Sequence, residues 1–169
     1  MGRTETRRLE QLVAVVAVLI EAFLQDRPER APELAILLGV LRPLGEVANL
    51  IALMKTVLGE SVKDVKVSPT LRESAVRLVA GEGAPDIHLE KLLRMHGQLQ
   101  SESAHVLEIN AGHRLIKDMA KRASAGGSND ALGDRIWLLL DQARILEGDA
   151  VLDANAFARR LASVLESGI

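Results

Sequence analysis

Apolar residues recur at helical spacing along the first third of the chain. Between residues 4 and 25 they follow a heptad seam made of Leu9, Leu12, Val16, Leu19 and Phe23. A second predicted helix begins near Pro32 and keeps its period to Gly59, with a kink or short break expected at Pro43. Residues 1–48 are therefore expected to form an antiparallel helical hairpin.

Beyond residue 59 the pattern changes to short runs of β-branched and aliphatic residues. Three such runs predict strands over residues 62–67, 75–80 and 104–109. Apolar residues at helical spacing predict helices over residues 87–96, 110–122, 130–147 and 154–166. Asp153 is placed to cap the start of the last helix, and Gly148 to end the one before it. The expected fold is α+β and mostly helical.

Composition excludes several classes of protein. The chain has 169 residues, of which 48% are hydrophobic and 26% charged, and this suits one globular domain or one domain with a small addition. Its formal net charge of −2 provides no basic field that would favour a nucleic-acid partner. Cysteine is absent, which excludes disulfides and thiolate metal sites and fits a cytoplasmic protein.

One uninterrupted apolar run, over residues 12–20, raises the question of a targeting or membrane segment. Glu10 and Glu21 flank the run closely, and it is much shorter than the roughly 20 residues that a membrane-spanning helix needs. We interpret it as part of a buried helix, and we expect no membrane partner.

Residues 136–140, Ile-Trp-Leu-Leu-Leu, are five consecutive apolar residues inside a predicted helix. At 3.6 residues per turn they point in all directions around the helix axis, so this helix must be covered on more than one side. Either the rest of the chain covers it, or a second copy of the chain does so in a two-fold four-helix bundle. The pattern alone favours neither.

From about Asn49 onward, an ordered series of segments is similar to one known family. It begins at residues 50–65 and continues through residues 73–80, 88–93 and 107–117. The strongest match is WLLLDQARILEG at residues 137–148, followed by Asp153 and residues 156–161. Together these segments resemble the C-terminal dimerisation domain of HtpG-type chaperones, the bacterial branch of the ninety-kilodalton heat-shock protein family.

The resemblance implies a long helix, a small three-stranded antiparallel sheet, and a C-terminal helix pair that forms a dimeric four-helix bundle. On that basis we predict a homodimer whose interface contains Trp137, Leu139, Leu140, Leu146, Phe157, Leu161 and Leu165. The resemblance also implies a role in a stress-response chaperone. The family's ATPase domain is not expected in this chain, so we expect no enzymatic activity, no catalytic residue and no cofactor.

Residues 1–48 depart from the family, in which a middle domain and a polar linker precede the matching segment. The hairpin predicted here instead runs into residues 49–169 in helical phase. An engineered fusion and an unusual natural truncation both explain this, and we favour the fusion because a rigid helical splice requires continuous phase. The heptad seam could also join chains into larger assemblies.

The predicted helix from Asp86 to His96 corresponds to a helix that shows apolar side chains to unfolded clients in the family. Leu89, Leu92 and Leu93 match that apolar face, and Met95 adds adaptable apolar surface. The alternative is that these leucines pack on the sheet.

Motifs for metal or catalytic chemistry are weak. The four histidines, His88, His96, His105 and His113, lack the i, i+4 spacing of a helical zinc site. The glycine pairs near residues 81–83 and 126–127 lack the context of nucleotide-binding loops, and no nucleophile elbow occurs. We expect no metal site.

Overall fold

The computed structural model describes residues 15–16, 18–19, 31–98, 105–126 and 129–167. In chain order the elements are α2 (Ala31–Leu58), the short 3-10 helix η2 (Gly59–Ser61), β1 (Asp64–Val67), β2 (Val76–Val79), α3 (Ile87–Met95), β3 (Val106–Ile109), α4 (Arg114–Ser124), α5 (Asn129–Leu146) and α6 (Ala154–Glu166). Most of the helix predicted over residues 4–25, and with it the hairpin pairing, lies outside the described residues. Within the described part of the chain, none of the helices has the length and apolar character needed to cross a membrane.

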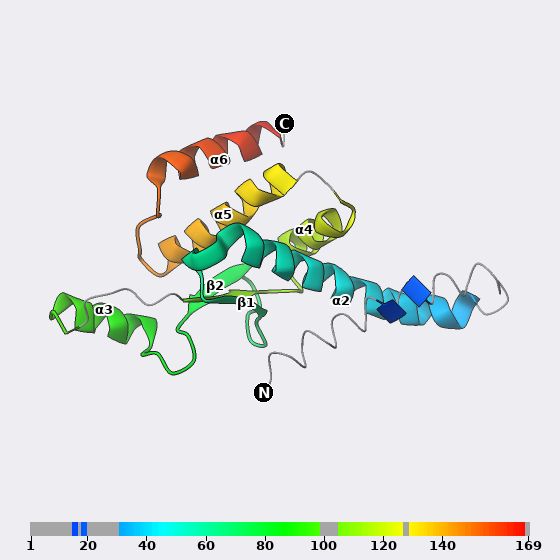
Figure 1. The fold of residues 1–169 in the computed structure, drawn as a ribbon, viewed down its shortest axis with the longest axis horizontal. Coiled ribbons are helices and arrows are strands. Elements are labelled where there is room, and N and C mark those ends of the chain that lie inside the picture. Colours follow the sequence, from blue (N-terminus) through cyan, green and yellow to red (C-terminus); the bar gives the residue numbers. More distant parts are fainter. Residues whose placement is uncertain (1–14, 17, 20–30, 99–104, 127–128, 168–169) are drawn as a thin grey trace.

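Helix α2 runs without interruption from Ala31 to Leu58 and includes Pro43. The predicted break is therefore not formed. Pro43 is exposed, so water can bond the carbonyl that the missing proline N–H leaves free. Leu50, Met54 and Leu58 recur every four residues on one buried face, whereas the N-terminal half of the helix extends beyond the rest of the folded chain (Figure 1).

The three strands form one sheet in the order β1-β3-β2. β3 pairs with β2 in antiparallel register, in which Leu78 lies opposite Leu107. β3 pairs with β1 in parallel register, in which Val65 lies opposite the same Leu107. The expectation of an antiparallel sheet is therefore wrong for one of the two strand pairs. A strand inserted between two strands of opposite direction must run parallel to one of them.

The core lies between one face of this sheet and the helices α2, α4 and α5 (Figure 1). The sheet contributes alternate residues of each strand, as a half-buried sheet requires, and these include Val65, Val76, Leu78, Leu107 and Ile109. Met54 of α2, Met119 of α4 and Leu140 of α5 belong to the same buried cluster. The sheet and three helices therefore form one continuous core.

Helix α4 begins later than predicted, at Arg114 rather than near Asn110. The ring of His113 caps it by accepting a hydrogen bond of 3.2 Å from the Leu115 amide. Asn110 instead holds loops together, because its side-chain amide donates to the carbonyls of Arg72 and Ser74 and its oxygen accepts from Gly112. Side-chain hydrogen bonds of this kind compete with helix formation, and they delay the start of α4.

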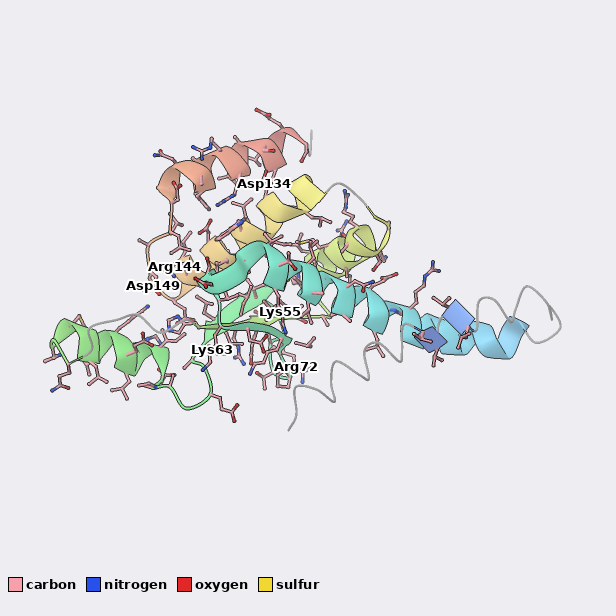
Figure 2. All side chains as sticks on the ribbon, in the orientation of Figure 1. Lys55, Lys63, Arg72, Asp134, Arg144 and Asp149 are labelled. Atoms are coloured by element: carbon pink, nitrogen blue, oxygen red, sulfur yellow. The ribbon has the colours of Figure 1, made fainter. Side chains whose placement is uncertain are left out.

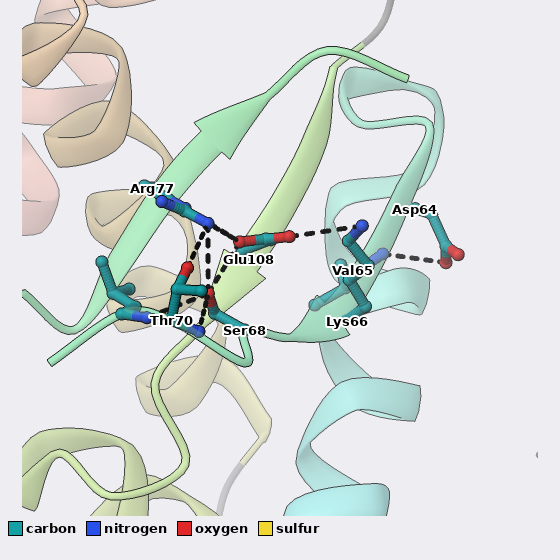
Figure 3. Close-up of polar contacts among 8 residues, drawn as sticks. Asp64, Val65, Lys66, Ser68, Thr70, Arg77 and Glu108 are labelled. Atoms are coloured by element: carbon teal, nitrogen blue, oxygen red, sulfur yellow. Dashed lines mark hydrogen bonds and ion pairs between the residues drawn. The ribbon is translucent and has the colours of Figure 1, made fainter. Parts of the chain in front are cut away.

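On the opposite face of the sheet, Glu108 of β3 is the centre of a polar network (Figure 3). Lys66 of β1 and Arg77 of β2 lie directly across from it, at 3.2 and 2.6 Å from its two carboxylate oxygens. The Ser68 hydroxyl donates a further hydrogen bond of 2.7 Å. Burial disfavours the charged form of Glu108, but these hydrogen bonds outweigh it and lower the pKa of the carboxyl. The network therefore joins all three strands through one ionised side chain.

Candidate functional site

The last two helices form an antiparallel pair, with α6 on the outside of α5 (Figure 1). α6 starts at Ala154 because the Asp153 carboxylate accepts a hydrogen bond of 2.9 Å from the Ala156 amide, which also lowers the pKa of Asp153. Ala156 is buried, whereas most other residues of α6 are exposed or half-buried. One face of α6 is thus fixed on α5, and the opposite face is open.

Large apolar side chains remain exposed on this helix pair and on the turn that joins the helices. We call them the C-terminal apolar surface; its members are Ile145, Leu146, Leu152, Leu161 and Leu165. Three of the predicted interface residues, Leu146, Leu161 and Leu165, belong to it. Trp137 and Phe157 are half-buried. Exposed apolar surface of this extent is typical of a site that contacts another protein.

Two predicted interface residues lie elsewhere. Leu139 and Leu140 are only 3% and 1% exposed and belong to the core. They have almost no surface left for a second copy to cover. On this side α5 packs against β2, α2 and α4, so the chain itself covers this part of the apolar run at residues 136–140.

Polar contacts also join α5 to α6. The guanidinium of Arg160 lies 4.9 Å from the centroid of the Trp137 ring and 3.7 Å from the Asp134 carboxylate. Asp134, labelled in Figure 2, lies on the side of α5 that faces α6. The shallow groove between the helices is lined by Asp134, Ala156, Arg159, Arg160 and Ser163. The groove itself is therefore mainly polar, in contrast to the C-terminal apolar surface.

A carboxyl group is buried within the same helix pair. Asp141 of α5 is 1% exposed, and its Oδ2 accepts no hydrogen bond from the described residues. Burial raises the pKa of Asp141, against the opposing influence of Arg160, Arg144 and the Leu152 amide. Arg160 of α6, Arg144 of α5 itself and a backbone amide of the turn before α6 thus partly offset an unfavourable buried charge in α5.

Helix α3 carries a second exposed apolar surface and projects from the body (Figure 1). Leu89, Leu92 and Met95 recur every three residues, and Met95 is 76% exposed. We call these three residues the α3 stripe. Leu93 was predicted to share this face, but it is half-buried and less exposed than the three residues of the stripe. The alternative that the leucines of this helix pack on the sheet does not describe Leu89 and Leu92.

The opposite face of α3 is attached to the body. Ile87 lies in the core cluster, and the buried carboxylate of Glu90 is 3.2 Å from the His105 ring. The Lys91 ammonium lies 3.0 Å from the Asp149 carboxylate and donates to the Glu147 carbonyl in the turn after α5. These contacts fix which face of α3 is turned to solvent.

The described residues contain no group of three or more histidine, aspartate or glutamate side chains placed to hold a metal ion. His105 faces Glu90 and His113 caps α4, so both already have structural roles. His88 of α3 and His96, which directly follows this helix, are exposed.

The family model described as Hsp90 protein matches residues 44–169. The chain belongs to the Hsp90 family. The resemblance read from the sequence is confirmed at the level of this chaperone family. The match begins inside α2, a little before the boundary predicted at residue 49, and the division of the chain at that boundary stays a prediction.

The Hsp90-family segment has relatives among curated bacterial chaperones. It is 54% identical over 127 residues to the chaperone protein HtpG of Paramagnetospirillum magneticum, covering 75% of this chain and 20% of that protein. It is 54% identical over 121 residues to the chaperone protein HtpG of Rhodospirillum rubrum, covering 71% of this chain and 19% of the relative. It is 48% identical over 126 residues to the chaperone protein HtpG of Roseobacter denitrificans, covering 73% of this chain and 20% of that protein. The chain thus spans about a fifth of the length of the curated relatives it matches.

Sequence reasoning missed two polar features of this Hsp90-family chain, the Glu108 network and the buried Asp141. Glu108 stands in a predicted strand between Leu107 and Ile109, and alternation alone places it on the solvent face. The available signal for Asp141 was its helical spacing from the apolar run: it follows Leu138 by three residues and Trp137 by four. Neither pattern indicates which partners lie across the fold.

Proposed function

We propose that residues 44–169 are the homodimerisation module of an HtpG-type chaperone, at the C-terminal end of the parent protein. The observation that carries the proposal is the C-terminal apolar surface, which the described part of the chain leaves exposed on α5, α6 and their turn. Within the module we infer a role in assembly and not in ATP hydrolysis, and we infer a cytoplasmic location.

A second copy of the chain is the occupant that fits this surface best. Two antiparallel helix pairs related by a two-fold axis form a four-helix bundle, in which the same residues meet on both sides. Leu161 and Leu165 are one helical turn apart on α6, and such spacing lets side chains of one helix fit between those of another. An obligate interface of this kind buries roughly 2,000 Å² or more in total.

Within this proposal, the predicted interface residues divide into two groups. Leu146, Leu161 and Leu165 contact the partner copy directly, with Trp137 and Phe157 contributing their exposed parts. Leu139 and Leu140 support α5 from inside the monomer. The dimer thus depends on both groups. Only substitutions in the first group should weaken the affinity between two chains without lowering the stability of each chain.

The test is molar mass by light scattering across a dilution series, for the native chain and two matched variants. Leu161→Glu places a charge on the proposed interface, and Leu115→Glu places one on α4. The two leucines are equally exposed, at 39% each. The native chain and Leu115→Glu should keep the mass of two chains, and Leu161→Glu should have the mass of one. A native chain that is monomeric at every concentration would contradict the proposal.

A specific observation favours a second function, the binding of unfolded protein by α3. Leu89, Leu92 and Met95 form an exposed stripe, with relative exposures of 48%, 48% and 76%. Suppression of the aggregation of a denatured protein should be lost when Leu89 and Leu92 are changed to serine. His88→Ser, at an exposed residue of the same helix, is the matched control. Equal suppression by all variants would exclude the α3 stripe as the binding surface.

For residues 1–48 we propose a helical element joined to the family domain in helical phase, as in an engineered fusion. The family match does not include residues 1–43, and α2 crosses the start of the match as one helix. If the heptad seam predicted over residues 4–25 also joins chains, light scattering should give a defined mass larger than two chains.

A further inference from the structure

Helix α3 depends on the body of the protein for its order. It has nine residues, and isolated helices shorter than about 12–15 residues are marginal in water. Its outward side chains are exposed, and it projects from the body next to the turn between α5 and α6 (Figure 1). The few contacts on its inward face therefore decide whether the α3 stripe is presented as an ordered surface.

One of these contacts reaches the end of another helix. The Lys91 ammonium donates to the carbonyl of Glu147 and lies 3.0 Å from the Asp149 carboxylate, labelled in Figure 2. Glu147 directly follows the last residue of α5. The final carbonyls of a helix lack intrahelical partners and carry partial negative charge, so a lysine there caps the helix. Lys91 thus caps α5 from a neighbouring helix.

The surroundings strengthen this contact. The side chains of Lys91 and Asp149 are 21% and 14% exposed, so solvent screens their interaction less than it screens a surface pair. The second carboxylate oxygen of Asp149 is buried and accepts no hydrogen bond from the described residues, which leaves Lys91 as its ion-pair partner there. Removing the lysine charge would leave a poorly solvated carboxylate behind.

We propose that Lys91 is a positioning residue that makes the order of the α3 stripe depend on the turn between α5 and α6. This rests on the proposed function, in which the α3 stripe contacts unfolded protein and α5 and α6 form the dimer. Ile145 and Leu146 stand beside the turn and are exposed. A second copy packed on them would hold residues 147–149 in place and, through Lys91, would order α3. Dimerisation therefore regulates the client-binding surface.

The test is hydrogen exchange of the whole chain, resolved by mass spectrometry. Lys91→Met keeps most of the apolar stem and removes the charge, and Asp149→Asn removes the partner charge. Each should speed exchange of the α3 amides about tenfold, which corresponds to about 1.4 kcal/mol. The double variant should be no faster than the single variants, because both lose the same contact. Lys117→Met, at an exposed lysine of α4, should leave α3 unchanged.

Three results would overturn the inference. Unchanged α3 exchange in both single variants would show that Lys91 does not order the helix. Strictly additive effects would show that Lys91 and Asp149 act separately. Equal acceleration in α3 and in β3 would show a general loss of stability. Asp149→Asn, which keeps the size of the side chain, serves as the milder variant should Lys91→Met fold poorly.

Regulation by the dimer is tested with Leu146→Glu. If this variant is monomeric, its α3 amides should exchange faster than those of the native dimer, and aggregation suppression should weaken because α3 must then be ordered on binding. Monomers with unchanged α3 exchange would overturn the regulatory step. Light scattering separates this failure from failure of the proposed function. The native chain and Lys91→Met should both have the mass of two chains if the proposed function holds, and a monomeric native chain would contradict the proposed function itself.

Discussion

The guanidinium of Arg160 lies over the ring of Trp137, 4.9 Å from its centroid, and so joins α6 to α5. Trp137 is the single tryptophan of the chain, so tryptophan fluorescence reports on the surroundings of this one ring. Arg160→Gln should lower the free energy of unfolding by about 0.5–2 kcal/mol through loss of the cation–π interaction. It should also shift the emission of Trp137 to longer wavelength as water reaches the ring. Arg159→Gln, at the exposed neighbouring arginine, should do neither.

Leu139 and Leu161 should respond differently to truncation. Leu139 lies in the core, so Leu139→Ala should cost about 2–5 kcal/mol in the stability of each chain. Leu161 lies on the C-terminal apolar surface, so Leu161→Ala should chiefly raise the concentration at which two chains separate. Urea unfolding at high and low protein concentration distinguishes the two effects. A concentration-independent midpoint for both variants would argue against Leu161 as an interface residue.

The Glu108 network should make stability fall in acid. The pKa of Glu108 is lower in the folded chain than its ordinary value of 4.5, so its contribution is present above that pH and is lost as pH falls through the folded pKa. Glu108→Gln should lower stability by about 1.5–3 kcal/mol at pH 7, the usual range for hydrogen bonds to a charged group. The difference from the native chain should shrink below pH 4.5, where the unfolded glutamate becomes protonated. Glu73→Gln, at an exposed glutamate, is the control for the loss of one charge.

Asp141 should give the opposite pH dependence. Burial raises its pKa above the ordinary value of 3.8, so between the two values the folded chain binds more protons than the unfolded chain. The contribution of Asp141 to the free energy of unfolding therefore declines as pH rises from 3.8 through its folded pKa. Asp141→Asn should gain stability relative to the native chain as pH increases from 3.8 towards neutrality, in unfolding measured by circular dichroism. A constant difference across that range would show that the Asp141 carboxyl does not titrate differently on folding.

Two glycines of the α5 region provide a paired test of backbone conformation. Gly148 has a φ of +78°, whereas Gly133 lies inside α5, and an added Cβ would meet no atom within 4 Å at either position. Gly148→Ala should lower stability by about 1–2 kcal/mol, because an L-residue is strained at positive φ. Gly133→Ala should raise it by about 0.5–1 kcal/mol, because alanine favours the helix. Thermal unfolding of both variants, followed at one wavelength, should show a lower Tm for Gly148→Ala and a higher Tm for Gly133→Ala than for the native chain.

Period and capping residues predicted the helices after residue 59, and only the start of α4 differs by more than two residues. The last helix was expected at residues 154–166 with Asp153 as its cap, and the structure has both. The strand positions also agree, to within two residues at each end. These are local properties, because they depend on neighbours three or four positions apart or on alternation along a strand. The pairing of β3 between β1 and β2 is not local, and its parallel half could not be read from any one strand.

The same distinction applies to the candidate site. Leu139 and Leu161 have equivalent apolar side chains in neighbouring helices, and only the packing of β2, α2 and α4 on α5 separates core from surface. The contact between Lys91 and Asp149 joins residues that are 58 positions apart. No sequence motif links these two positions, so this contact could not be predicted. By contrast, the family resemblance named Leu89, Leu92, Leu93 and Met95 from the sequence, and the structure exposes all of these except the half-buried Leu93.

Helix α2 has a mechanical consequence for whatever the chain is joined to at its N-terminal side. Its 28 residues form a rod about 42 Å long, of which only the C-terminal part is embedded in the core. The embedded part fixes the direction of the rod, so a body attached at the free end would be held at a set distance and angle. A two-fold assembly would contain two such helices. A small rotation of the embedded C-terminal part of each helix would displace its N-terminal end by a much larger distance. Pro43, where the helix lacks one backbone hydrogen bond, is the place at which such a lever would bend first.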